Sequence, residues 1–151
     1  MRTGLLLCGI IGSILCAYDI YITIKVEENG DFEPLCDLGF EAVQCSKVIK
    51  SDYSYLLSKW NLVSKDSMLN LSNAILFMPY YLFIIGYNFQ TSIPKNVLFY
   101  ASAAVCLGCV YLACVLMFVI KTLCLVCAML YVVSGTIFYY GLEEYKEYER
   151  I

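Results

Sequence analysis

The sequence predicts an all-α membrane protein: a bundle of four transmembrane helices with one large polar loop between the first and the second. Of the 151 residues, 61% are hydrophobic, and the mean hydropathy of +0.72 lies well above that of soluble proteins. Long uncharged runs recur along the chain, and a helix of about 20 apolar residues crosses the core of a bilayer. The net charge is only −3 and there is no basic stripe, so nothing indicates a nucleic-acid partner.

Four spans follow from the uncharged runs, and we expect them within a single domain, 1–151, at residues 4–24, 69–91, 97–120 and 122–142. The first span contains one acidic residue, Asp19, near its exit. A cleaved signal peptide is the alternative for this segment, because Arg2 precedes an apolar core. No cleavage site followed by a new domain is clear, so a membrane span is favoured.

The large loop, expected at residues 25–68, holds 13 of the 23 charged residues of the chain. With four spans, this loop and the tight turn at Lys121 fall on the same side of the membrane. Arg2 and Lys95 fall on the opposite side, which the positive-inside rule therefore favours as cytoplasmic. A four-span scaffold of the tetraspanin type would carry its large loop between the third and fourth spans, so the position of this loop argues against that class.

Cysteine is the residue type that can carry chemistry here, because the chain has nine cysteines and no histidine. The lack of histidine excludes His-ligated zinc, Ser-His-Asp triads and Cys-His pairs. Thiols inside membrane spans mostly behave as small hydrophobic groups, and five cysteines fall there: Cys8, Cys16, Cys106, Cys109 and Cys114. Although Cys106 and Cys109 form a C-x-x-C pair, the pair lies about 15 Å deep at 1.5 Å per residue, and we expect no catalytic role.

Cys124 and Cys127 form a second C-x-x-C pair, placed in the first turn of the fourth span and facing the loop. A helix N-terminus stabilises a thiolate. The loop itself carries Cys36 and Cys45, for which a structural disulfide or a shared metal site with the helix pair are the alternatives. Two loop thiols facing two membrane-edge thiols favour a relay, in which an outer thiol exchanges with a soluble partner and an inner one serves the helix pair. We expect no metal.

The depth of Cys127 favours a lipid-soluble substrate, and quinones are the obvious class. Tyr131 lies one helical turn beyond Cys127 on the same face, and Asn73 lies near the start of the second span, in the same leaflet. Both are therefore candidates for substrate binding. The alternatives are that Asn73 caps a helix and that Tyr131 belongs to the aromatic belt of the membrane.

Five segments of this chain occur in the order found in a known family: LCDLG, CSKV, DSMLNLSNAI, GCVYLAC and CLVCAMLY. On these segments the chain resembles the vitamin K epoxide reductase family, including its animal paralogue, from about residue 15 to 131. The resemblance implies four transmembrane helices around a quinone pocket in the endoplasmic reticulum membrane. It also implies a luminal loop that caps the active site, and cytosolic termini.

The resemblance implies a role for each of the four outer cysteines. Cys127 resembles the residue that attacks the quinone or epoxide ring, and Cys124 its resolving partner. Cys45 corresponds to the residue that exchanges with Cys124, and Cys36 to the one that serves an external thioredoxin-like or protein disulfide isomerase-like protein.

The resemblance further implies that Asn73 and Tyr131 hydrogen-bond the oxygens of the naphthoquinone. The implied reactions are reduction of vitamin K 2,3-epoxide to quinone and of quinone to hydroquinone, in support of gamma-carboxylation. They use a thiol reductant and no tightly bound cofactor, and 4-hydroxycoumarin inhibitors are expected ligands. A quinone-dependent thiol oxidase, which runs the relay in reverse, is the alternative, because redox partners set the direction. The loop lacks the Gly-rich, Trp-containing sequence of the well-known animal members, so substrate and inhibitor fit follow less directly.

Overall fold

The computed structural model describes residues 2–90 and 92–151, and this part of the chain is helical, with a single isolated β-bridge between Val43 and Leu123. Its long helices are α1 (Arg2–Glu28), α4 (Asn73–Phe89), α5 (Lys95–Cys114), the π-helix η2 (Val115–Ile120) that continues α5, and α6 (Leu125–Glu149). The large loop, residues 29–72, contains three short helices: α2 (Cys45–Ile49), η1 (Asp52–Ser54) and α3 (Leu56–Lys59). The all-helical class expected from the sequence is confirmed.

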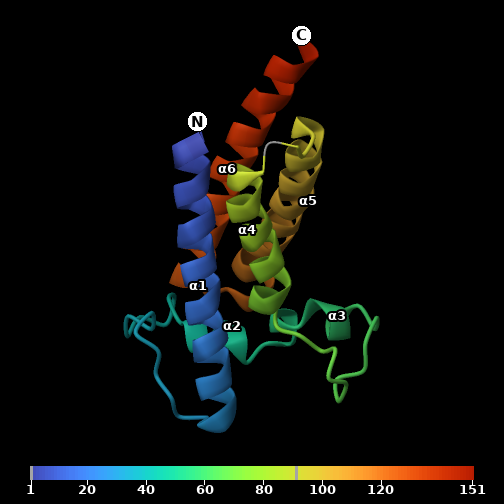
Figure 1. Ribbon diagram of the computed structural model, residues 1–151. Helices are drawn as coiled ribbons and strands as arrows, with labels where there is room; N and C mark the ends of the chain where they lie inside the picture. The colour runs from blue at the N-terminus through green and yellow to red at the C-terminus, as the bar shows by residue number, and fades with distance from the viewer. Residues whose placement is uncertain (1, 91) are drawn as a thin grey trace.

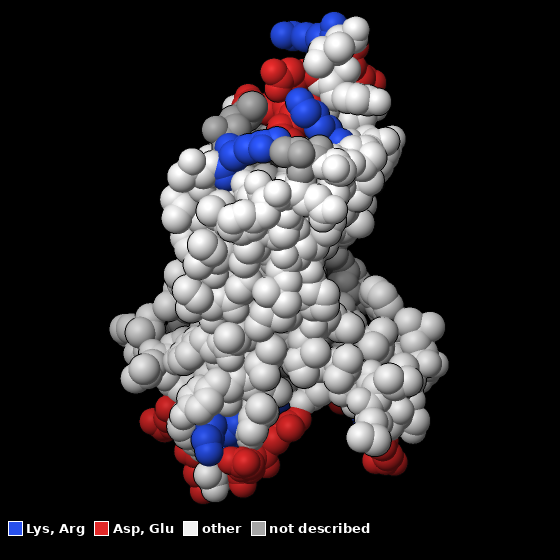
Figure 2. Space-filling model, in the orientation of Figure 1, with Lys and Arg blue, Asp and Glu red and all other residues white. Residues whose placement is uncertain are grey.

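Three helical segments of the described chain are long and apolar enough to cross a membrane: α1 with 27 residues, α5 with η2 with 26, and α6 with 25. On the face shown in Figure 2, charged residues gather at the two ends of the molecule and leave an uncharged belt between them. Such a belt matches the apolar core of a bilayer. The second expected span, 69–91, is shorter at its start, because residues 69–72 still belong to the loop and α4 has 17 residues. Residue 91, the expected end of this span, lies outside the described residues.

The other long helices extend beyond the expected spans into polar sequence. Helix α1 reaches Glu28 instead of residue 24, and α6 ends at Glu149 instead of residue 142. Helix α6 also begins at Leu125, three residues later than the expected 122. Charged residues at a helix end remain compatible with helical backbone in water, so an uncharged run marks the apolar length and not the end of the helix.

The bundle is held together by α1, which packs against α4 and α6, and by α5, which packs against α6 (Figure 1). Tyr81 of α4 lies at the junction of three helices and is almost fully buried. Its hydroxyl lies 2.7 Å from the hydroxyl of Ser134 on α6. Its ring lies so close to Gly12 of α1 that no side chain fits there, so this glycine permits the close approach of α1 and α4.

The large loop lies at the end of the bundle opposite to both termini (Figure 1). At this end Lys121 adopts the left-handed conformation, with φ of 55°, and ends η2. The backbone N–H of Leu123 then donates to the carbonyl of Ala42 in the loop, at 2.8 Å. The loop and the α5–α6 turn are therefore joined by backbone, and both carry cysteines.

Candidate functional site

The four outer cysteines meet where the large loop covers the bundle. Cys36 and Cys45 form a disulfide, with their Cα atoms 6.0 Å apart. The sulfur of Cys124 lies 3.3 Å from that of Cys45. The Cys45 sulfur is thus bonded to the Cys36 sulfur in the loop and in contact with the Cys124 sulfur of the bundle. A thiolate at Cys124 can attack such a disulfide, and the reverse exchange uses the same contact.

The residues that directly follow Cys36 and Cys45 in the chain are hydrogen-bonded to each other and hold Cys45 in place. The Asp37 carboxylate accepts a hydrogen bond from the backbone N–H of Ser46, at 3.2 Å, and a second from its hydroxyl. Ser46 lies in the first turn of α2, whose free N–H groups favour a carboxylate. This cross-connection and the disulfide fix Cys45 at the start of α2, where it is fully buried.

Cys124 is the N-cap residue of α6, and Cys127 lies in the first turn of that helix. The backbone of Cys124 is extended, and its sulfur accepts a hydrogen bond from the N–H of Cys127, at 3.4 Å. The sulfur therefore takes the position that a serine or aspartate oxygen takes at an ordinary N-cap. The C-x-x-C spacing places one sulfur at the helix end, toward Cys45, and the other one turn further into the bundle.

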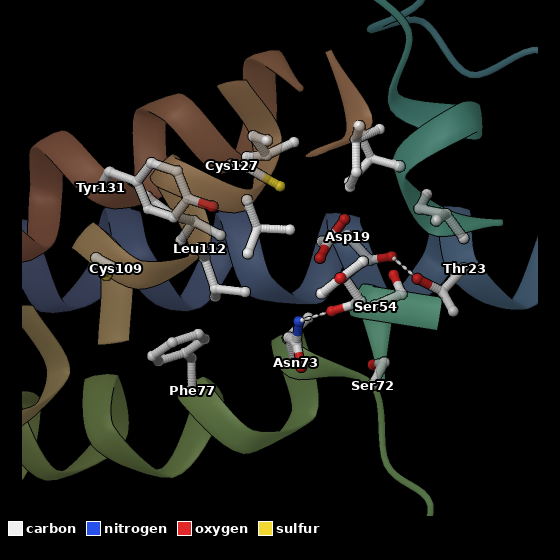
Figure 3. A pocket seen from close by; sticks show the side chains of 18 of the residues that line it. Asp19, Thr23, Ser54, Ser72, Asn73, Phe77, Cys109, Leu112, Cys127 and Tyr131 are labelled. Carbon is white, nitrogen blue, oxygen red and sulfur yellow. Dashed lines mark hydrogen bonds between the residues drawn. The ribbon is translucent and has the colours of Figure 1, made fainter. Parts of the chain in front are cut away.

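A cavity lies beside Cys127, between α1, α4, α5 and α6 and under the loop (Figure 3). Cys127, Tyr131 and Asn73, which we expected to act together, all line it. The free space is small, about 50 Å³, which corresponds to roughly three or four water molecules. A bicyclic ring therefore enters only when side chains or the loop move apart.

Asn73 connects the cavity to the loop. It is the first residue of α4, and its side-chain oxygen accepts from the backbone N–H of Leu56, at 3.2 Å. Its amide nitrogen donates to the carbonyl of Tyr53, at 2.7 Å. The N-cap of α4 is Ser72, so Asn73 is not the capping residue that the alternative reading proposed. The first bond uses the amide oxygen, and the second uses one of the two amide N–H groups.

Several residues of the cavity wall were not among the expected binding residues: Asp19, Thr23, Tyr53, Phe77 and Cys109. Helical spacing could have found Phe77, because it follows the expected residue Asn73 by one turn. Thr23 follows Asp19 by one turn in the same way, but neither of these two was expected at the site. Nothing in the sequence shows which face of α5 turns inward, so Cys109 could not have been separated from Cys106. Of this pair, Cys109 is buried and lines the cavity.

A shared metal site for the outer cysteines was the other alternative. Ligand atoms of Cys36, Asp37 and Cys45 do lie within 4.8 Å of one another. The two sulfurs are bonded to each other, however, and in that state they offer no thiolate to a metal ion.

The fold and site define a class: a helical membrane protein that carries two adjacent cysteine pairs, one of them at the start of a helix beside a cavity. Comparison with known proteins then gives the family. The model of the vitamin K epoxide reductase family matches residues 4–142, and the chain belongs to this family. The resemblance noted from the five sequence segments is confirmed.

Two relatives cover nearly the whole chain. Vitamin K epoxide reductase complex subunit 1 of Rattus norvegicus is 28% identical over an alignment of 151 positions, which covers 98% of this chain and 92% of the relative. The protein of the same name from Mus musculus is 27% identical over an alignment of 152 positions, which covers 99% of this chain and 91% of the relative. Family membership and the helices together make this chain a membrane oxidoreductase.

Proposed function

We propose that the protein reduces vitamin K 2,3-epoxide to the quinone, and the quinone to the hydroquinone, in the membrane of the endoplasmic reticulum. The 3.3 Å contact between the sulfurs of Cys45 and Cys124 is the observation that carries this proposal. It joins a disulfide in the loop to a thiol pair beside a membrane-embedded cavity, as electron transfer from water to a lipid-soluble ring requires. The product would support gamma-carboxylation.

The proposed topology has four crossings, with α4 as the second, the large loop in the lumen and both termini in the cytosol. The 17 residues of α4 span about 26 Å at 1.5 Å per residue, close to the hydrocarbon thickness. Arg2 and Lys95 lie near the end opposite to the loop, where they line one pocket together. Their position supports a cytosolic assignment of that end.

The proposed relay passes two electrons inward by disulfide exchange. A thioredoxin-like or protein disulfide isomerase-like protein reduces the loop pair through Cys36. The thiolate of Cys45 then attacks an oxidised Cys124–Cys127 disulfide, and Cys36 resolves the mixed Cys45–Cys124 disulfide. This last step leaves a Cys36–Cys45 disulfide beside two free thiols, which is the bonding pattern described above.

At the ring, the Cys127 sulfur is the proposed nucleophile. Asn73 and Tyr131 would hydrogen-bond the ring oxygens, where negative charge develops during attack. Cys124 then releases the product by bonding to Cys127. Both Asn73 and Tyr131 line the cavity beside Cys127, which supports these assignments. No tightly bound cofactor is required, and 4-hydroxycoumarins are proposed to compete for the cavity.

Access for the external reductant requires movement of the loop, because only 5% of Cys36 is exposed. The neighbouring Leu35 and Phe40 are exposed by 89% and 68%. Exposed apolar side chains in the same loop as the Cys36–Cys45 disulfide fit a redox partner that binds unfolded or apolar segments. We propose that partner binding opens the loop at Cys36.

The test is turnover of vitamin K epoxide and quinone by the purified protein in lipid nanodiscs with a dithiol reductant. Wild type is expected to turn over both, and Cys127→Ser neither. Cys114→Ser is the matched control, because that thiol is exposed on the outer surface of α5. Full turnover by Cys127→Ser would remove the assigned nucleophile.

The second candidate is a quinone-dependent thiol oxidase. In that function electrons pass through the same contact between the Cys45 and Cys124 sulfurs in the opposite direction. The assay separates the two functions by substrate. Reduction of quinone without any reduction of epoxide, together with disulfide formation in a reduced client protein, would favour the oxidase.

A further inference from the structure

Asp19 is a carboxylic acid within a membrane-spanning helix, and the redox relay does not use it. Its side chain lines the cavity together with that of Cys127. In the view of Figure 3 the carboxylate lies between the Cys127 sulfur and the amide of Asn73. Ionisable residues are costly inside a bilayer, and where they occur they usually mark a functional site.

No basic group among the described residues compensates this carboxylate. The ion pairs there are Lys25–Glu28, Lys65–Asp52 and Lys95–Glu147, and none includes Asp19. Its backbone carbonyl accepts from the Thr23 hydroxyl, at 2.8 Å, but that bond does not involve the carboxylate. Structural pairing therefore does not explain why a carboxylate occupies this wall.

The groups around Asp19 suit proton transfer. Among the described residues that line the cavity, Asp19 is the only one with a carboxyl or amino group. The titratable groups that face the same cavity from the other elements are Tyr53 of the loop, Tyr81 of α4, Cys109 of α5, and Cys127 and Tyr131 of α6. Cys16 lies one turn before Asp19 on α1. All of these are thiols or phenols, which are much weaker acids than a carboxylic acid, so Asp19 is the group of this set that is most readily deprotonated and free to accept a proton.

We infer that Asp19 carries a proton from the Cys127 thiol to the ring oxygen during nucleophilic attack. The inference rests on the proposed function and adds a catalytic residue to it. Proton transfer by a carboxyl group requires hydrogen-bond reach of both partners. Asp19 of α1 and Cys127 of α6 line the same cavity, so a ring that enters it can meet both side chains.

The step balances for the epoxide. Asp19 takes the thiol proton as the Cys127 sulfur bonds to a ring carbon, the C–O bond of the epoxide breaks, and Asp19 returns the proton to the freed oxygen. The sulfur of Cys124 then bonds to that of Cys127 and the C–S bond breaks. Its electron pair forms the ring double bond and expels the hydroxyl, which leaves as water with the proton of Cys124. Two thiols are oxidised to a disulfide, the epoxide is reduced, and Asp19 ends unchanged.

The kinetic test compares Asp19→Asn, Asp19→Glu and Glu28→Gln in nanodiscs with epoxide and dithiol. Asp19→Asn keeps the shape of the side chain but cannot carry the proton, so kcat should fall about 10²- to 10⁴-fold while KM stays within about threefold. Asp19→Glu should recover part of kcat. Glu28→Gln, on the same helix but exposed, should match wild type. An unchanged kcat in Asp19→Asn, or a loss confined to KM, would overturn the inference.

A second readout does not depend on vitamin K. N-ethylmaleimide is a neutral acceptor that Cys127 attacks as it would a quinone, and peptide mass spectrometry gives its labelling rate at each pH. With Asp19 as proton acceptor, wild type should label about tenfold faster than Asp19→Asn at pH 7, and the difference should shrink as the pH rises and hydroxide takes over the deprotonation of the thiol. Identical profiles would overturn the inference. If wild type reduces neither quinone nor epoxide, the proposed function fails, and the labelling profiles still decide whether Asp19 accepts the proton.

Discussion

The sulfur of Cys124 lies 3.3 Å from that of Cys45, although the two residues are 79 positions apart in the chain. Each sulfur has a second neighbour on its own element. Cys45 is bonded to Cys36 in the loop, and Cys124 accepts the backbone N–H of Cys127 at the start of α6. The loop and the bundle therefore meet at one pair of atoms that can exchange a disulfide.

Removal of Cys36 should trap the exchange intermediate. In Cys36→Ser the sulfur of Cys45 loses its partner while that of Cys124 remains in contact, so a Cys45–Cys124 disulfide should form on mild oxidation. Peptide mass spectrometry under non-reducing conditions detects this cross-link between the loop and α6. Cys114→Ser should show the wild-type pattern. A free Cys45 thiol in Cys36→Ser would contradict the contact.

Replacement of Cys124 should stop the reaction one step later than replacement of Cys127. In Cys124→Ser the nucleophile remains but cannot be resolved, so a covalent adduct between Cys127 and the quinone should accumulate. Intact-protein mass spectrometry measures the added mass, and the double variant Cys124→Ser/Cys127→Ser should lack it. An adduct on any other cysteine would reassign the nucleophile.

Loss of the Asn73 amide should loosen the loop above the cavity. Asn73→Ala leaves the N–H of Leu56 and the carbonyl of Tyr53 without their side-chain partner, which costs about 1–3 kcal/mol where the groups are shielded from water. Hydrogen exchange at Leu56 should speed up accordingly. Asn88→Ala is the matched control, because its amide donates to the carbonyl of Ile84 on its own helix, at 2.9 Å, and to no other group among the described residues. Equal exchange in both variants would contradict the role of Asn73 in holding the loop.

The close contact of α1 with α4 should make Gly12 intolerant of any side chain. A Cβ atom at this position would overlap the ring of Tyr81, so Gly12→Ala should lower the stability by about 1–3 kcal/mol. Thermal unfolding in detergent measures the change. At Gly86 nothing lies within 4 Å of a built Cβ atom, and Gly86→Ala should unfold at the same or a higher temperature because alanine favours helix. A stable Gly12→Ala would show that Tyr81 can move.

The helical class and the family could be predicted from the sequence, because apolar runs and short cysteine segments are local patterns. The ends of the helices could not. Residues 69–72 continue the uncharged run of α4, yet they belong to the loop, since the lack of charge alone does not show where helical hydrogen bonding begins. The C-x-x-C pair at the start of α6 could be predicted, because it is a local pattern within the segment CLVC.

The contacts across the bundle required the structure. The presence of Asp19 in an apolar run was plain, but the sequence does not show whether that face of α1 meets lipid or the cavity. The same applies to Cys109, whose face of α5 lines the cavity while Cys106 does not. The contact of Cys45 with Cys124 lies beside a backbone bond between Leu123 and Ala42, which no sequence pattern marks.

That backbone bond also bears on how such a chain can diverge. Because the main chain of Leu123 and Ala42 forms it, no particular side chain is needed to keep the loop attached to the α5–α6 turn. Residues 53–72 lie after Cys45 and beyond this attachment, so substitutions there can reshape the roof of the cavity and its choice of ligand without shifting the two sulfurs. Under the proposed function, substrate range and electron delivery can therefore change independently over evolutionary time.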